Sequence, residues 1–152
     1  MGYALVKWIH VLLAITAVGA NITYGVWLAR ARKDAAVLPF VLRGIKMIDD
    51  RIANPCYVLL LVTGLVMAWM SSIPFTTPWL LTSLVLYVAL AIVGFVGYTP
   101  ALRRQIEALD RGGVTSVDYL TQAKRGQIYG AVLAALVTAI TFLMVVKPGL
   151  WV

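Results

Sequence analysis

Four long runs of mostly apolar residues divide the chain, and shorter charged segments separate them. A helix that crosses a bilayer needs about 20 consecutive apolar residues. Four segments meet this requirement, at residues 5–28, 52–70, 79–98 and about 127–146. The pattern predicts an all-α fold, an integral membrane four-helix bundle that forms one transmembrane domain over residues 1–152.

The helical pattern extends beyond the second apolar run toward the N-terminus. Pro39 suits the first turn of a helix, and the apolar residues after it recur at helical spacing. We therefore expect the second helix to begin near Leu38 and to be kinked at Pro55, inside the span. Helices extended in this way would protrude from the bilayer.

The segment between the third and fourth runs contains the clearest break in the chain. The third helix is expected to continue to about Leu109, and Gly112-Gly113 to end it. Ser116 then predicts the N-cap of the last helix, because a serine oxygen accepts hydrogen bonds from free backbone N–H groups of the first turn.

Composition excludes a soluble enzyme and a disulfide-stapled scaffold. The chain is 62% hydrophobic and only 12% charged, with a mean hydropathy of +0.91, whereas soluble domains are about a quarter charged. A single cysteine, Cys56, cannot form an internal disulfide. The net charge of +7 is explained by insertion topology and anionic lipid headgroups, so no nucleic-acid partner is expected.

The basic residues are distributed unequally between the two sides of the predicted bundle. Only Lys7 and Lys147 fall on one side, and the other eleven lie in the two segments that face the opposite side. The positive-inside rule therefore places both termini outside the cytoplasm. The eleven are Arg30, Arg32, Lys33, Arg43, Lys46, Arg51, Arg103, Arg104, Arg111, Lys124 and Arg125.

All six carboxylates lie in the same two segments as these bases. We interpret Asp49 and Asp50, beside Lys46, as part of a solvated cluster of ion pairs at the cytoplasmic edge. With no carboxylate inside a predicted span, a transporter or channel is the least supported class of function.

A polar stripe runs along the first predicted helix. His10, Asn21 and Tyr24 fall near one line at 100° per residue. Polar groups at membrane depth face a bundle interior or a cavity, because lipid offers them no hydrogen bonds. His10 is the only histidine in the chain, and either a metal or a simple hydrogen-bond partner would satisfy it.

Antiparallel threading brings three methionines to the depth of His10. Met67 and Met70 end the second span, and Met144 lies near the end of the fourth. Imidazole with thioether is a ligand pair for haem iron, and it also suits Cu(I). We predict a cofactor site of His10, Met67, Met70 and Met144, supported by Asn21 and Tyr24, in which His10 and Met67 are the metal ligands. Methionine also fills gaps in apolar helices, so a structural role for these residues stays open.

The first two helices carry a family resemblance. Residues 5–12 (LVKWIHVL), followed by Gly19 and Arg30, resemble the first helix of small bacterial membrane proteins in which a lysine, two hydrophobic residues and a histidine precede a glycine. Residues 43–64 resemble the second helix of an uncharacterised four-helix family of predicted integral membrane proteins. Copper-resistance D-type proteins and HemJ-type protoporphyrinogen oxidases look like more distant relatives.

The resemblance implies haem b or copper near the outer face of a bacterial inner membrane, with His10 as a ligand. Because this chain has no second histidine, bis-histidine ligation within one subunit is impossible. The first functional hypothesis is a haem b-associated redox or haem-handling protein, with copper as the alternative metal. The second is a cofactor-free accessory or assembly subunit that binds its own copies or a larger membrane complex.

Overall fold

The computed structural model describes residues 1–149, and it folds them into four long helical rods with no strand among those residues. The first rod is α1 (Gly2–Ala31), and the last is α6 (Val117–Val146). The two middle rods are compound: α2 (Leu38–Ile48), η1 (Asp49–Ala53) and α3 (Asn54–Met70) form one, and α4 (Pro78–Ile92), η2 (Val93–Tyr98) and α5 (Thr99–Gly112) form the other.

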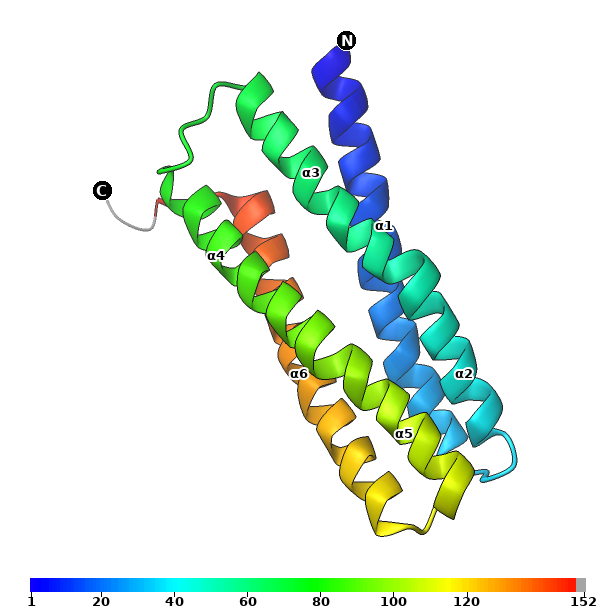
Figure 1. The fold of residues 1–152 in the computed structure, drawn as a ribbon. Coiled ribbons are helices and arrows are strands. Elements are labelled where there is room, and N and C mark those ends of the chain that lie inside the picture. The colour runs from blue at the N-terminus through cyan, green and yellow to red at the C-terminus, as the bar shows by residue number, and fades with distance from the viewer. Residues whose placement is uncertain (150–152) are drawn as a thin grey trace.

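All four rods are long and apolar enough to cross a membrane, with 30, 33, 35 and 30 residues in chain order. At 1.5 Å per residue they measure about 45 to 52 Å, which exceeds the roughly 30 Å of a hydrocarbon core. The predicted all-α, four-span architecture with overlong helices is therefore confirmed. Figure 1 shows the first turns of α1 and the last turns of α6 at one end, beside the loop between α3 and α4. Which membrane face this end occupies stays a prediction.

The rods associate as two pairs that meet at one end only. α1 packs along α3, and α6 packs along α4 and α5, whereas the contacts between the pairs involve mainly α2 with α5. In Figure 1 the pairs converge toward α2 and α5 and diverge toward the N-terminus. We call these the closed end and the open end.

The main cluster of buried apolar residues lies toward the closed end. Leu42 is completely buried there, and Leu102 is 2% exposed. Elsewhere large apolar side chains cover the outside of the rods, as at Ile15 (64% exposed) and Val145 (76% exposed), a surface that suits lipid. The cluster consists of Tyr24, Ala31, Leu38, Leu42, Ile45, Leu90, Tyr98, Leu102, Ala108, Leu109, Tyr119 and Leu133.

Both compound rods contain a π-helical turn directly before a proline. The N–H of Asn54 donates to the carbonyl of Asp49, and the N–H of Thr99 donates to the carbonyl of Gly94, each five residues back. Asn54 precedes Pro55 and Thr99 precedes Pro100. A proline has no N–H to continue the regular ladder, and single π-helical turns are frequent at functional sites. At Pro55, where a kink was expected, the structure has a π-helical turn directly before the proline.

The predicted starts and stops agree with the structure. The second rod begins at Leu38, and the third continues to Gly112, three residues beyond the expected Leu109. Gly113 has a φ of +72°, which is accessible to glycine at little cost. The Ser116 side chain accepts a hydrogen bond from the N–H of Tyr119 over 3.3 Å, so the predicted N-cap is confirmed.

Candidate functional site

His10 lies in the contact surface between α1 and α3. Its Nδ1 is 2.7 Å from the hydroxyl oxygen of Thr63, and the ring is partly buried. The position that a Cβ on Gly64 would take is 3.3 Å from Cε1 of His10. Gly64 therefore permits the imidazole to approach the backbone of α3, and a larger residue there would push it away.

Which group donates in the contact between His10 and Thr63 depends on the tautomer of His10. A threonine hydroxyl has one proton, and Thr63 donates it to the carbonyl of Leu59 over 2.8 Å. When Thr63 donates to Leu59, Nδ1–H of His10 is the donor in the contact with Thr63. In a neutral imidazole with that tautomer Nε2 carries the lone pair, and the His10 ring also lies within hydrogen-bonding reach of the backbone carbonyl of Leu60. An imidazole held through one nitrogen with the other free is the usual arrangement of a metal-ligating histidine.

Two of the predicted methionines lie on the same stripe of α3 as Thr63. Positions 63, 67 and 70 follow the i, i+4, i+7 spacing of one helix face. The ends of this stripe touch α1, because Thr63 contacts His10 and the methyl group of Met70 is 3.5 Å from the position of a Cβ on Gly2. Met67, partly buried, lies between these two contacts along α3, one helical turn from Thr63.

This arrangement differs from the one expected from the sequence. We expected His10 and a methionine to face each other across a bundle interior. The structure places His10, Met67 and Met70 side by side along one seam between two helices. Met144 lies on α6, in the other helical pair. It is therefore not part of the seam between α1 and α3.

Asn21 and Tyr24 belong to a different part of the molecule. They follow His10 by 11 and 14 residues on α1, which corresponds to about 16 and 21 Å along the helix axis. The Asn21 amide donates to the hydroxyl of Tyr57 and to the carbonyl of Ala17. Tyr24 is 3% exposed, and its hydroxyl has no hydrogen-bond partner. The structure therefore does not bring Asn21 and Tyr24 to His10, and their predicted supporting role stays a prediction.

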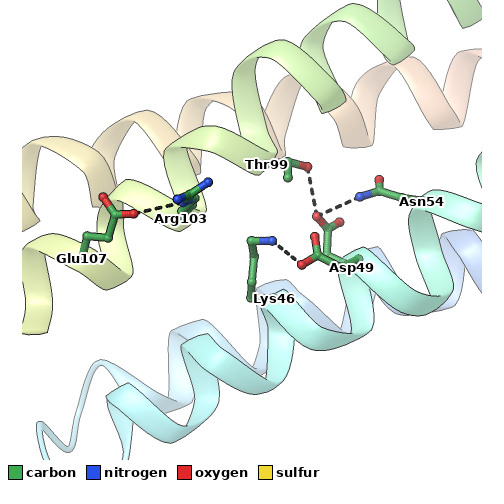
Figure 2. Close-up of polar contacts among 7 residues, drawn as sticks. Lys46, Asp49, Asn54, Thr99, Arg103 and Glu107 are labelled. Atoms are coloured by element: carbon green, nitrogen blue, oxygen red, sulfur yellow. Dashed lines mark hydrogen bonds and ion pairs between the residues drawn. The ribbon is translucent and has the colours of Figure 1, made fainter.

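Asp49 is a buried carboxylate that the sequence interpretation missed. Its side chain is 5% exposed, and Oδ2 accepts hydrogen bonds from Asn54 over 3.3 Å and from Thr99 over 3.0 Å. Figure 2 shows the two donors converging on it from opposite helices. Lys46 pairs with the exposed Asp50 instead. The predicted solvated cluster is thus correct for Asp50 and wrong for Asp49, because tertiary packing covers only the latter.

A signal for this burial was present in the sequence. Leu38, Leu42, Ile45 and Ala53 are all buried, and Asp49 continues their i, i+4, i+7 stripe. A carboxylate on an apolar stripe is a candidate for burial. Its hydrogen-bond donors are the residues before Pro55 and Pro100, and sequence spacing alone does not bring these two positions together.

A cavity of about 120 Å³ adjoins Asp49 at the junction of the two helical pairs. Asn21 lines it from α1, Tyr57 from α3 and Tyr87 from α4. Tyr87 also donates a hydrogen bond to the backbone carbonyl of Tyr57. Within residues 1–149, no group of three or more His, Cys, Asp or Glu side chains is placed to hold a metal ion, so a metal site would depend on methionine.

Residues 4–148 match a family described as a predicted integral membrane protein (DUF2269). The chain belongs to this family. The comparisons with curated proteins and with solved structures found no match. The match agrees with the resemblance seen in the first two helices, and it identifies the chain as an integral membrane protein without naming an activity. The more distant resemblance to copper-resistance D-type and HemJ-type proteins stays a prediction.

Proposed function

We propose that the protein handles copper at the non-cytoplasmic side of the membrane, binding one Cu(I) ion through His10 and Met67. The observation that carries this proposal is the 2.7 Å contact between Nδ1 of His10 and the Thr63 hydroxyl, which in the Nδ1–H tautomer would leave the Nε2 lone pair to a metal. Met67 lies one turn away on the same seam, and thioether and imidazole ligands suit Cu(I). When bound, copper would supply one-electron exchange.

Haem b, the group first expected at His10, needs more space than a single copper ion. A porphyrin needs a broad pocket beside its axial ligand, and neither the cavity beside Asp49 nor the hollow on α6 between Ala134 and Leu143 is lined by His10 or by any of the three methionines. A single copper ion needs only the ligand atoms of the α1–α3 seam. The proposal therefore favours copper, and haem binding is an outcome that the same preparation reveals.

The test is a competition titration of detergent-purified protein with Cu(I) and a chromophoric Cu(I) chelator under reducing, oxygen-free conditions. We expect one Cu(I) per chain. His10→Ala and Met67→Leu should each weaken binding at least about tenfold. Met47→Leu is the matched control, because Met47 is 56% exposed on α2, and it should bind like the wild type.

Thr63→Val sharpens the test without removing a ligand. It keeps the shape of residue 63 and abolishes the hydrogen bond to His10, so we expect an affinity loss of about 10-fold to 100-fold. Unchanged Cu(I) affinity in His10→Ala would overturn the proposal. A Soret band in protein from haem-replete cells, lost in His10→Ala, would establish haem instead. A protein that binds neither Cu(I) nor haem and always co-purifies with the same partner would favour the accessory-subunit alternative.

A further inference from the structure

Asp49 is a buried carboxyl group that makes no ion pair with another described residue. The ion pairs among residues 1–149 are Arg43–Asp110, Lys46–Asp50 and Arg103–Glu107, and none includes Asp49. No lysine or arginine lines the adjoining cavity. An ionised carboxylate that is buried without a counter-ion is strongly unfavourable.

The hydrogen bonds around the cavity leave acceptors free. Asn54 and Thr99 both bind Oδ2 of Asp49, and no hydrogen bond reaches Oδ1 from the described residues. Asn21 and Asn54 use their amide N–H groups as donors, so their amide oxygens also have no partner there. Asp49, Asn21 and Asn54, which all line the cavity, thus carry one carboxyl oxygen and two amide oxygens without a hydrogen bond from the described residues, a set complementary to a cation that carries several N–H donors.

The rest of the wall is aromatic and limits the size of the ligand. Tyr57, Tyr87, Phe95 and Tyr98 line the cavity together with Asp49. Aromatic rings attract ammonium groups through the negative potential of their faces. The volume of about 120 Å³ equals roughly four water molecules at about 30 Å³ each, so it accommodates a cation of only a few heavy atoms.

We propose that the cavity between the two helical pairs is a binding site for a small primary ammonium ion, with Asp49 as the counter-ion and Asn21 and Asn54 as further acceptors. The cavity is bordered by both π-helical turns, through Asp49 of η1 and Tyr98 of η2. The ligand would therefore join α1, α3, α4 and α5 where the pairs meet. This site is separate from the copper site, and each can fail independently.

The test uses methylammonium chloride as the probe on detergent-purified full-length protein. We expect a saturable rise in Tm of about 2–5 °C near saturation, together with saturation transfer from tyrosine ring protons to the probe's methyl signal in NMR. Asp49→Asn keeps an acceptor for Asn54 and Thr99 and removes the charge, so it should abolish both signals. Asp50→Asn is the matched control, because it removes the neighbouring exposed carboxylate and should leave them unchanged.

Sodium chloride at the same concentration as methylammonium chloride is the control for ionic strength. A Tm shift caused by ionic strength alone would be the same with both salts. Equal Tm shifts with both salts in the wild type and in Asp49→Asn would overturn the proposal. A shift with sodium alone, lost in Asp49→Asn, would also overturn it, since it would assign the cavity to an inorganic cation. Retention of the methyl saturation-transfer signal in Asp49→Asn would show that the probe binds elsewhere.

Discussion

The open and closed ends of the bundle differ in how their polar side chains find hydrogen-bond partners. At the open end Nδ1 of His10 contacts Thr63 across a seam of two helices. At the closed end Asp49 is covered by both helical pairs and receives donors from Asn54 and Thr99. The open-end site is accessible and simple, whereas the closed-end site depends on the packing of distant segments. The free energy of unfolding should therefore depend mainly on the closed end.

Truncating the core of the closed end should have the largest effect. Leu42 is 0% exposed, and Leu42→Ala removes buried methyl groups and leaves a cavity, so we expect the free energy of unfolding to fall by about 2–4 kcal/mol. The measurement is equilibrium unfolding in mixed micelles. Ile15→Ala, at a position 64% exposed, should cost much less, and equal losses would contradict the contrast between the ends.

The second effect concerns the donors around Asp49. Asp49→Ala leaves Asn54 and Thr99 without their acceptor, and buried unsatisfied groups cost about 1–3 kcal/mol. Asp49→Asn keeps an acceptor oxygen and removes an uncompensated charge, so it should be at least as stable as the wild type without ligand. Thermal unfolding of both variants in the same detergent tests this order. A less stable Asp49→Asn would mean that the charge is compensated in the fold.

Replacing each of two glycines at the closed end by alanine should change the stability of the protein in opposite directions. Gly113 has a φ of +72°, so Gly113→Ala should destabilise the turn between α5 and α6 by about 1 kcal/mol. Gly44 lies within α2, and a Cβ there meets nothing within 4 Å. Gly44→Ala should stabilise by about 0.5–1 kcal/mol through helix propensity. Their Tm values, measured in parallel, check both signs.

The smallest effect is expected from the ion pair that joins the two helical pairs on the surface. Arg43 and Asp110 are 2.7 Å apart, with side chains 60% and 49% exposed. Solvent-exposed pairs contribute about 0.2–1 kcal/mol and weaken with salt. Asp110→Asn should therefore lower Tm slightly at low ionic strength and not at 0.5 M NaCl. A loss as large as that of Leu42→Ala would show that the surface pair, rather than the core, holds the closed end together.

Local features of the sequence were sufficient for the elements of the fold. The start at Leu38 and the cap at Ser116 follow from short-range patterns, and the structure confirms both. The position of His10 on an inward stripe was also predictable from helical spacing. Its partner Thr63 was not, because it is 53 residues away and a seam between two antiparallel helices has a register that apolar periodicity leaves open.

The amino-acid sequence by itself determined that this chain forms four membrane-crossing helices, because apolar run length and charge placement act locally. Only the tertiary structure decided that Asp49 is buried while Asp50 pairs with Lys46. Adjacent residues on a helix point about 100° apart, so the packing of α5 against the second rod covers one carboxylate and leaves its neighbour in solvent. The same packing explains why Asn21 and Tyr24 lie near the junction of the two helical pairs and not beside His10, as the sequence had suggested.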